Sequence, residues 1–342
     1  MHRPTVKDLA EAANVSVATV NRVLAGTASV REATRKRIEI AAAQIGFYGL
    51  GSIQARNTAA RPKLKFGILL LQPHRHFYQA VATALHDAAA RFTSAEISLE
   101  VEFLEDLSPQ NTAQKAIALA QRCDAIALTS AVHPLVIQAV ETIQASNKPV
   151  FALISQLSAT GQVHYIGLDN WKVGRTSAWA MSKICKRAGK VGILLGNHRY
   201  RNQEMNEAGF RSYFREHAPD FALLEPIQTF EAGSVAEEMT ERLLHDHPDL
   251  VGLYVSGGGI SGVLAALSDP SRPPDLVVVG YDLMAQTKAG LLDGRLTFVI
   301  SHPLAELAEK AISSMVRSVA APSETTVFTS IVPFEIYTSE NV

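Results

Sequence analysis

The chain has 342 residues, 47% of them apolar, and its 32 basic and 33 acidic residues give a net charge of −1. This length allows two or three domains with a sizeable core, and the near-neutral total disfavours a protein that binds nucleic acid along its whole surface. No apolar run reaches the roughly 18 residues of a membrane span, so no membrane association is expected.

The charges are unevenly distributed along the chain. Residues 1–61 hold nine basic and four acidic side chains, a net charge of +5, whereas the remainder holds 23 basic and 29 acidic side chains, a net charge of −6. A basic head on an acidic body predicts that only the head meets a polyanion. Cys123 and Cys185 are too few for a disulfide framework, and no apolar leader precedes Lys7, so we expect a cytoplasmic protein.

The first 48 residues predict three short helices. Thr5 followed by Asp8 has the spacing of a capping box at the start of the first helix. Ser16 is placed to cap the second helix, and Ser29 with Glu32 repeats the capping-box spacing for the third. Two short helices joined by a tight turn and supported by a third are typical of a helix-turn-helix domain.

The second helix of such a domain lies in the major groove of DNA, where its N-terminal residues contact base edges. Arg22 lies further along the same face as the start of this helix, and arginine is the commonest bidentate reader of guanine. The alternative is a generic three-helix bundle in which Arg22 is only solvated. The candidate DNA contacts of the head are Thr5, Ser16, Val17, Ala18, Thr19, Asn21 and Arg22.

The segment TVKDLAEAANVSVATVNRVLAG, residues 5–26, resembles the N-terminus of the LacI/GalR family of bacterial repressors. The family pattern reads roughly T-x-x-D-V-A-x-x-A-G-V-S-x-x-T-V-S-R-V-L-N. Asn14 replaces the usual turn glycine, and asparagine tolerates the left-handed conformation. Asn21 replaces the usual serine at a phosphate-contacting position. The match disfavours the generic bundle.

The stalk at residues 49–63 corresponds to the segment that becomes a short hinge helix in the family when the operator is bound. A leucine of that helix enters the minor groove and bends the DNA. Here Gly49 and Leu50 stand where Pro-Asn is usual, Arg56 or Asn57 falls near the wedge position, and Ile53 and Leu50 are the nearby apolar candidates. Ile53 and Arg56 are therefore the expected DNA contacts of the stalk.

From Phe66 onward, short apolar runs alternate with helical stretches. This alternation predicts parallel strands covered on both faces, a doubly wound α/β body whose ligands lie beyond the carboxyl ends of the strands. The resemblance to the family continues here and implies a periplasmic-binding-protein-like fold, with two lobes, three crossovers and a ligand cleft between the lobes. The expected strands are 66–71, 97–104, 125–129, 149–154, 163–168, 190–196, 250–255, 276–282 and 296–301.

The expected domain boundaries follow from these assignments. The helix-turn-helix domain should take residues 1–48, the hinge 49–63 and the body 64–342. Within the body, we expect an N-lobe at about 64–168 plus 302–327 and a C-lobe at about 169–301 plus 328–342.

Several residues at strand ends are candidates for the ligand cleft. Gln72, His76, Phe77 and Tyr78 follow the first strand of the body. In sugar-binding relatives an aromatic side chain here packs on a pyranose ring, and the alternative is that Phe77 or Tyr78 belongs to the core. Trp171, at the start of a crossover helix, is a possible wall of the cleft.

The C-lobe offers further candidates. Asp282 ends a strand, and the family places this aspartate on ligand hydroxyls, although it could instead cap a helix. His302 ends another strand, at a position that is often glutamine in sugar binders. Asn206 stands where the family commonly has arginine, which removes a partner for a carboxylate ligand unless Arg199 or Arg201 compensates.

A glycine run, Gly257 to Gly259, replaces the usual Asn-Asp pair of the family. It predicts exposed backbone N–H groups and room for a bulky ligand, with Gly257 at the cleft. A phosphate-loop interpretation lacks the required G-K-[ST] sequence. No cofactor, metal site or catalytic residue is expected, because G-x-S-x-G is missing and His74 and His76 alone are weak metal candidates.

These features favour a ligand-responsive, sequence-specific DNA-binding transcriptional regulator, a repressor of the family that senses a sugar, polyol or related small metabolite. We expect a homodimer on double-stranded operator DNA, with each head reading half of a near-palindrome. One alternative is a sugar-binding protein without a DNA role, which the head and the missing leader disfavour. Another is a sugar-converting enzyme, which the missing catalytic set disfavours.

Overall fold

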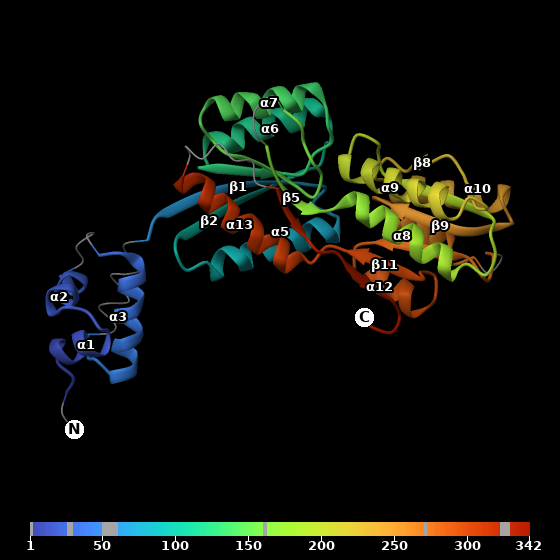
Figure 1. Cartoon of the computed structure of the whole chain (residues 1–342). Helices are drawn as coiled ribbons and strands as arrows, with labels where there is room; N and C mark the ends of the chain where they lie inside the picture. Colours follow the sequence, from blue (N-terminus) through green and yellow to red (C-terminus); the bar gives the residue numbers. More distant parts are fainter. Residues whose placement is uncertain (1–2, 26–29, 50–60, 160–162, 270–271, 322–328) are drawn as a thin grey trace. The chain divides into compact units, whose positions relative to one another are not determined.

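The computed structural model of the protein describes residues 3–25, 30–49, 61–159, 163–269, 272–321 and 329–342. The chain divides into two compact units, one of residues 1–63 with 93–96 and one of residues 64–92 with 97–342 (Figure 1). The first unit contains the head and the second contains the body. Among the described residues, no helix is long and apolar enough to cross a membrane.

The head consists of three helices around a small apolar core. The helices are α1 (Val6–Ala12), α2 (Val17–Ala25) and α3 (Glu32–Ile45). Leu9, Val20 and Ile38 come from one helix each, and all three are fully buried. Because each helix buries only one face, the opposite faces remain available to a partner.

The turns of the head are fixed by short side-chain contacts. The predicted capping box is confirmed: the Thr5 N–H donates to Asp8 Oδ2 at 2.7 Å, and the Asp8 N–H donates to Thr5 Oγ1 at 3.4 Å. Asn14 adopts the predicted left-handed conformation, with φ 49°. The cap position of α3 is Arg31, without a side-chain cap, and Ser29 lies outside the described residues.

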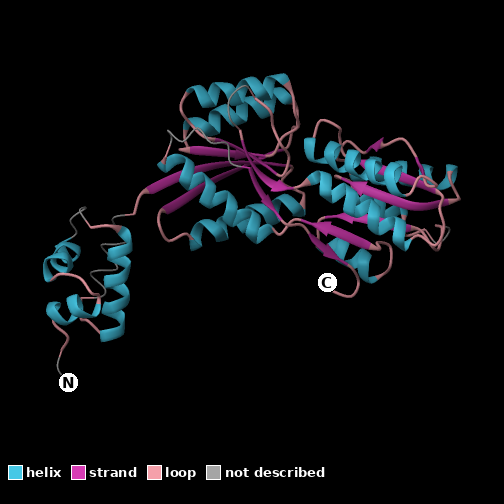
Figure 2. Ribbon diagram, viewed as in Figure 1, coloured by secondary structure: helices cyan, strands magenta, loops and turns pink. Residues whose placement is uncertain are grey.

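The first sheet of the body has the strand order β12-β5-β4-β3-β1-β2. Parallel pairing joins β1 to β3, β3 to β4, β4 to β5 and β5 to β12. Helices α6 and α7 lie on one face of this sheet and α5 and α13 on the other (Figure 2). The strands are β1 (Lys63–Leu71), β2 (Glu96–Leu104), β3 (Ala125–Leu128), β4 (Val150–Leu153), β5 (His164–Leu168) and β12 (Thr329–Val332), and the helices are α5 (His76–Arg91), α6 (Pro109–Gln121), α7 (Pro134–Ala145) and α13 (Leu304–Ala320).

The second sheet has the order β13-β11-β10-β9-β6-β7, with β8 also paired to β6. Its register-defined pairs are parallel except β11 with β13, which is antiparallel. The strands are β6 (Lys190–Leu195), β7 (Ala222–Leu223), β8 (Ile227–Gln228), β9 (Leu250–Ser256), β10 (Val277–Tyr281), β11 (Phe298–Ser301) and β13 (Glu335–Tyr337), and the helices are α8 (Asn170–Ile184), α9 (Arg201–His217), α10 (Gly233–Asp246), α11 (Ile260–Ala266) and α12 (Ala285–Leu292).

The chain passes between the two sheets three times, after β5, after β11 and after β12. The last crossing corrects an expected boundary. Residues 328–342 were assigned to the C-lobe, but β12 pairs with β5 in the first sheet, with Thr329 opposite Tyr165 and Val332 opposite Leu168. The crossing therefore lies between Val332 and Glu335, because the four-residue β12 completes the edge of the N-lobe sheet before the chain leaves it.

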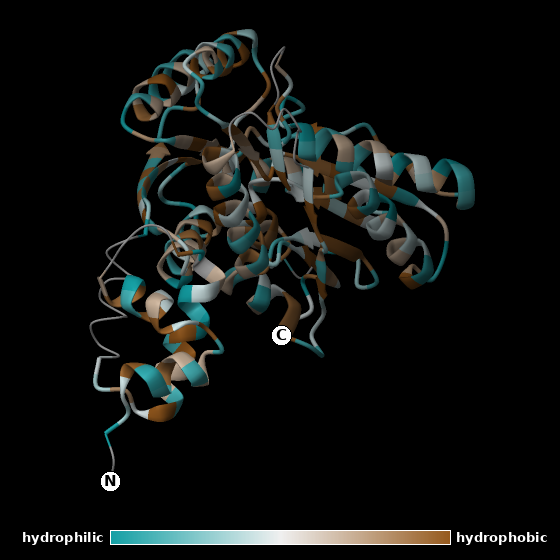
Figure 3. Ribbon diagram, turned by 60° about the vertical axis from the view of Figure 1, so that its left-hand side comes forward, coloured by the Kyte–Doolittle hydropathy of each residue, from teal (hydrophilic) through white to brown (hydrophobic). Residues whose placement is uncertain are grey.

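The apolar residues of the body gather on the strands, where Figure 3 shows most of the brown ribbon. Strands β3 and β4 are buried along their whole length, as expected for strands covered on both faces. The residues that follow such buried strands are held in place by a rigid sheet. This rigidity fixes the positions of the residues that line the cleft.

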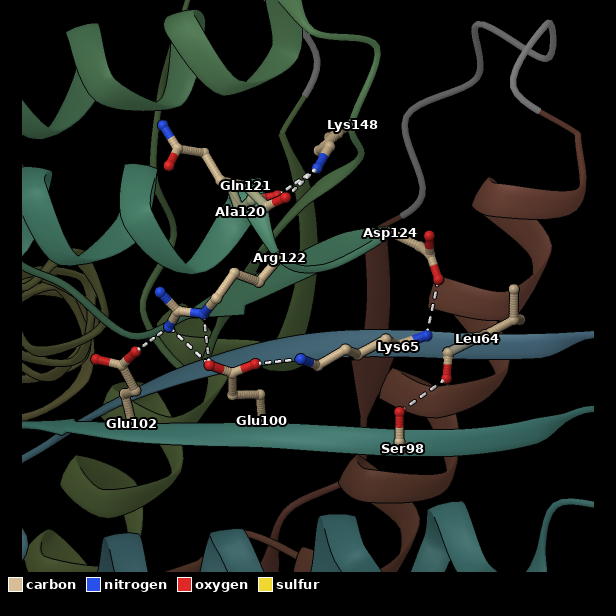
Figure 4. A network of polar contacts seen from close by, with 10 residues as sticks. All are labelled: Leu64, Lys65, Ser98, Glu100, Glu102, Ala120, Gln121, Arg122, Asp124 and Lys148. Atoms are coloured by element: carbon tan, nitrogen blue, oxygen red, sulfur yellow. Dashed lines mark hydrogen bonds and ion pairs between the residues drawn. The ribbon is translucent and has the colours of Figure 1, made fainter.

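The edge strand β2 carries a charged network instead (Figure 4). Lys65 Nζ lies 2.6 Å from Glu100 Oε2, and Arg122 contacts Glu100 Oε1 and Glu102 Oε1 at 2.6 Å. Hydrogen bonds from Lys65 and Arg122 lower the pKa of Glu100. Charged side chains on an edge strand disfavour pairing with a foreign strand.

Candidate functional site

The outward face of α2 presents the predicted DNA contacts of the head. Ser16, Val17, Ala18, Asn21 and Arg22 are exposed, Thr19 is half-buried, and Thr5 is exposed at the start of α1. Val20 and Val23, on the opposite face, are buried in the core. The helix is therefore anchored by one side and offers its other side to a partner.

Local hydrogen bonds order this exposed face. Ser16 Oγ accepts from the Thr19 N–H at 3.2 Å, which confirms Ser16 as the cap of α2, and it also lies 2.8 Å from Thr19 Oγ1. Arg22 Nε donates to the carbonyl oxygen of Ala18 at 3.3 Å, so the guanidinium lies along the helix on the side of its N-terminus. The predicted stalk contacts, Ile53 and Arg56, lie outside the described residues.

The body contains a cavity of about 330 Å³ lined by both lobes. The N-lobe contributes the residues after β1 and at the start of α5, and the C-lobe contributes α9 and the loops after β8, β9 and β10. The lining residues are His74, Arg75, His76, Phe77, Tyr78, Ile154, Asn202, Gln203, Asn206, Glu231, Gly233, Ser256, Gly257, Gly258, Gly259, Ile260, Ser261, Tyr281, Asp282, Met284 and Gln286.

Asp282 reaches the cavity from the end of β10, in a left-handed conformation with φ 62°. Its Oδ1 accepts from the His302 backbone N–H at 3.1 Å and lies 2.7 Å from His302 Nδ1. Oδ2 accepts no hydrogen bond from any described residue. The helix-cap alternative is wrong, because Met284 holds the cap position of α12 and the Asp282 carboxylate bonds to His302 instead.

Asn206 is fully buried on α9, and neither atom of its side-chain amide has a hydrogen-bond partner among the described residues. The hydroxyl of Tyr281 beside it likewise has no partner in the part of the chain that the structure describes. Burial raises the pKa of Tyr281, and the nearby Asn206 amide opposes that shift without completing a hydrogen bond to the hydroxyl. Two polar side chains that line the cavity therefore keep their hydrogen-bonding capacity unused within the protein.

Glycines bring α9 close enough to place Asn206. A Cβ on Gly174 of α8 would overlap the carbonyl oxygen of Asn206, and a Cβ on Gly209 would overlap the carbonyl oxygen of Trp171. The two helices thus pack backbone against backbone, and α9 is held rigidly beside the cleft.

Phe77 and Tyr78 form the aromatic part of the lining, and His76 precedes them at the start of α5. Phe77 and Tyr78 are 8% and 6% exposed and belong to the hydrophobic core of the body. Both residues also line the cavity, so each is part of the core and of the cleft wall. The guanidinium carbon of Arg75 lies 5.2 Å from the centre of the Tyr78 ring. Burial raises the pKa of Tyr78.

The structure adds an ion pair that the sequence did not predict. Arg75 of the N-lobe contacts the carboxylate of Glu231, which is in the C-lobe loop after β8. Gln203 Nε2 donates to Glu231 Oε1 at 2.6 Å, and Gln203 Oε1 accepts the backbone N–H groups of Gly196 and Asn197 at 2.7 and 2.9 Å. Burial alone would lower the pKa of Arg75. The nearby Tyr78 and Glu231 together raise this pKa by more than burial lowers it, so the net shift is upward.

The glycine run lines the cavity but does not leave the expected room for a bulky ligand. A Cβ on Gly258 would overlap Glu231 Oε2, and a Cβ on Gly257 would lie 2.6 Å from Gln203 Oε1. Side chains of the protein therefore occupy the space that these glycines provide.

Three predicted cleft residues lie outside the lining. Gln72 follows β1 in a left-handed conformation, with φ 29° and its Oε1 buried. Trp171 lies at the start of α8, where its backbone packs close to Gly209 and its side chain is 39% exposed. His302 is buried behind Asp282 and contacts that residue rather than the cavity.

The proposed compensating arginines are also outside the lining: Arg199 is exposed, and Arg201 pairs with Glu204 at 2.7 Å. Within the described residues, no group of three His, Cys, Asp or Glu side chains could hold a metal ion. The cleft is lined by amide, hydroxyl, carboxylate and aromatic groups together with the guanidinium of Arg75 and the imidazoles of His74 and His76.

Comparisons with known proteins agree with both parts of this arrangement. A model of the periplasmic binding protein domain matches residues 66–322, and a model of bacterial regulatory proteins of the lacI family matches residues 5–49. The ribose operon repressor of Bacillus subtilis is 25% identical over 320 residues, covering 90% of this chain and 89% of that protein. The HTH-type transcriptional regulator GalS of Salmonella typhimurium is 24% identical over 330 residues, covering 94% and 92%.

Solved structures show the same fold for the body. An ABC transporter solute-binding protein from Burkholderia graminis, in complex with D-arabinose, superposes with a TM-score of 0.74 at 20% identity and covers 81% of this chain and 96% of that one. A solute-binding protein from Agrobacterium vitis with bound D-fucose gives a TM-score of 0.72 at 18% identity, with the same coverage of both chains.

The relatives are transcriptional repressors and sugar-binding proteins rather than enzymes. A helix-turn-helix head joined to a two-lobed body with a polar cleft is the organisation of a ligand-responsive DNA-binding regulator. The chain therefore combines a helix-turn-helix domain of the lacI family of bacterial regulatory proteins with a body that belongs to the periplasmic binding protein domain family.

Proposed function

We propose that the protein is a repressor that binds operator DNA as a homodimer and that its effector is a neutral monosaccharide or polyol. Each head reads one half of a near-palindromic operator through α2, with Arg22 as a base-reading side chain. Because its target is chromosomal DNA, it acts in the cytoplasm. Effector and operator affinities are coupled, so each must change the other by the same factor.

The charges of the cavity support a neutral effector. Among the described residues that line the cavity, Arg75 is the only arginine or lysine, and its guanidinium is already paired with Glu231. The second carboxylate, on Asp282, contacts His302 through Oδ1, and its Oδ2 has no donor from any described residue. A ligand that carries a carboxylate or phosphate would therefore meet a cation that is already paired and a carboxylate oxygen that would repel it.

The unused hydrogen-bonding groups carry the proposal. The amide of Asn206 can donate and accept, the Tyr281 hydroxyl can do the same, and Asp282 Oδ2 accepts. A buried polar group without a partner costs roughly 1–3 kcal/mol, so a ligand that supplies partners is favoured at this place. Sugar and polyol hydroxyls both donate and accept, and their C–H faces can pack on Phe77 and Tyr78.

The names of relatives point the same way. One is a ribose operon repressor, and a D-apiose import binding protein of Paraburkholderia graminis is 24% identical over 284 residues, covering 82% of this chain and 87% of that protein. Pentoses and hexoses of this kind form the first set of compounds to test.

A thermal-shift screen of the full chain against aldoses, ketoses and polyols tests the effector class. At least one neutral compound should raise the melting temperature, because a ligand that binds only the folded body stabilises it. The same compound should change operator affinity in a gel-shift or fluorescence assay. Stabilisation by sugar acids or phosphates alone would contradict the proposal.

The homodimer is tested separately by sedimentation of the full chain. A dimer at micromolar concentration, unchanged by removal of DNA, supports assembly through the body. A monomer that dimerises only on a palindromic operator would place the contact in the DNA-bound heads instead.

A further inference from the structure

We propose that Glu231 is a specificity-determining residue of the effector cavity, which neutralises Arg75 and so excludes acidic sugars. This proposal rests on the proposed function, because it assigns charge selectivity to the same cavity. Neither residue contributes a ligand-binding group that the neutral effector requires. Their role is to set the charge at one end of the cavity.

The position of Glu231 is held by an unusual backbone. Phe230 and Glu231 both adopt the left-handed conformation, with φ values of 51° and 62°. Two successive non-glycine residues in this region are sterically unfavourable, because Cβ lies too close to the following carbonyl oxygen. The turn directs the Glu231 side chain inward, where it is 4% exposed, while Phe230 is 64% exposed. Strain of this kind persists where the surrounding structure requires the side chain to stay in place.

The surroundings of Glu231 are shaped to a carboxylate. A Cβ on Gly196 or on Gly258 would overlap one of its two carboxylate oxygens. Gln203 donates to Oε1 and is itself oriented by two backbone N–H groups. Arg75 contacts the other oxygen. Each carboxylate oxygen therefore has its own donor and its own glycine beside it.

Arg75, the partner of Glu231, faces the cavity from the N-lobe. Its side chain is 23% exposed, lines the cavity and lies over the ring of Tyr78. A guanidinium has five N–H donors in a fork that suits carboxylates, and among the described residues only Glu231 takes a donor from this side chain. Without Glu231, the same guanidinium would be an unneutralised cation in the cavity, ready to pair with a ligand carboxylate.

Glu231→Gln tests this inference directly. Glutamine keeps the shape and can still accept from Gln203, but it removes the charge that neutralises Arg75. Calorimetric titrations should use matched pairs of probes: D-galactose with D-galacturonate, D-glucose with D-glucuronate, D-ribose with D-ribonate and D-arabinose with D-arabinonate. The wild-type protein should prefer the neutral member, and the variant should gain about tenfold to hundredfold in affinity for the acid, as expected for a charge-assisted hydrogen bond.

Glu216→Gln is the matched control. The Glu216 carboxylate, like that of Glu231, pairs with an arginine: Arg175, which lies in the same lobe, donates to it at 3.0 and 3.1 Å. Unlike Glu231, Glu216 is 45% exposed and lies outside the cavity lining. Its loss should leave the preference between each neutral sugar and its acid unchanged. An equal gain in acid binding by this variant would show a general charge effect and overturn the role of Glu231.

The double variant Arg75→Gln/Glu231→Gln keeps the inference testable if the single variant does not fold, since it removes both charges together. Its preference for neutral sugars over acids should be close to that of the wild type, because this end of the cavity is again without net charge. A gain in acid affinity as large as that expected for Glu231→Gln would overturn the inference, and so would a wild-type protein that binds an acid as tightly as its neutral partner. If no neutral sugar or polyol binds the wild type at all, the proposed effector class fails instead.

Discussion

The head and the body place their recognition groups in opposite environments. In the head, Ser16, Val17 and Arg22 are exposed at and along α2, and Val20 and Val23 of the same helix are buried on its other face. In the body, Asn206 and Asp282 are 0% and 8% exposed, and they reach the same cavity from different elements. The recognition residues of the head are thus open to water, whereas Asn206 and Asp282 in the body are almost removed from it.

This difference determines which forces dominate at each site. Charges on an exposed face are screened by salt over about 8–10 Å at physiological ionic strength. Hydrogen bonds in a buried cavity are strengthened by their surroundings, and an unpaired group there is costly. The head is thus expected to depend on ionic conditions and the cleft on the fit of individual groups.

Salt should produce the largest difference between the two sites. Between 50 and 200 mM salt, operator affinity should fall on the order of a thousandfold, as for a protein that neutralises six phosphates. Affinity for a neutral sugar should change less than about twofold over the same range, because no counterions are released. Parallel titrations of the full chain with labelled operator and with the best sugar ligand measure both. If operator affinity and sugar affinity fell equally steeply with salt concentration, the head and the cleft would not differ in the way proposed.

Asp282→Ala should give the next largest effect and only in the body. It removes a carboxylate that accepts ligand hydroxyls, and we expect about a hundredfold loss of sugar affinity. Operator affinity without ligand should stay within about twofold. Calorimetry with the sugar and a gel shift with operator measure the two effects.

Asp293→Ala is the matched control for this change, since Asp293 pairs with Arg295 at 2.5 Å outside the cavity lining. Asp282→Asn keeps an acceptor for His302 and separates loss of charge from loss of the buried contact. Unchanged sugar affinity in Asp282→Ala would leave that residue as a structural partner of His302 alone.

The same contrast explains what could be predicted from the sequence. The head contacts lie within one continuous segment, so Thr5, Ser16 and Asn14 revealed their roles through local spacing. Strand-end residues of the body, such as Asp282, were also predictable, because the carboxyl ends of parallel strands meet at one edge. All nine expected strands are present among the described residues.

Glu231 could not be found in this way. Its partner Arg75 is 156 residues away in sequence, and its position depends on a left-handed turn that no glycine or asparagine announces. Similarly, β7 and β8 have two residues each, too few to form a hydrophobic pattern. Features set by long-range packing or by very short elements are thus the ones that local patterns missed.

Arg22→Ala should have a smaller effect, confined to the head. Loss of a bidentate guanine contact costs about 1–3 kcal/mol on the specific operator and much less on scrambled DNA. The test is to measure the affinity of Arg22→Ala for the operator and for scrambled DNA at one salt concentration. Lys36→Ala, an exposed cation on α3, should weaken both more evenly if it contacts phosphate. Equal losses on both DNAs for Arg22→Ala would make Arg22 a phosphate contact.

The smallest expected effect comes from Thr5→Ala, which removes the cap of α1 without touching the apolar core. The Thr5 hydroxyl oxygen accepts the Asp8 N–H, and the hydroxyl also donates to the Asp8 carboxylate at 2.8 Å. Loss of such a cap costs about 1 kcal/mol, so amides of α1 should exchange hydrogen roughly fivefold faster. Thr5→Ser keeps the hydroxyl and should restore most of the protection.

Because the head and the body are separate compact units, sugar affinity should not change in Thr5→Ala. A loss of sugar affinity in Thr5→Ala would mean that the stability of α1 is felt in the cleft, and the exposed and buried sites could then no longer be treated as independent.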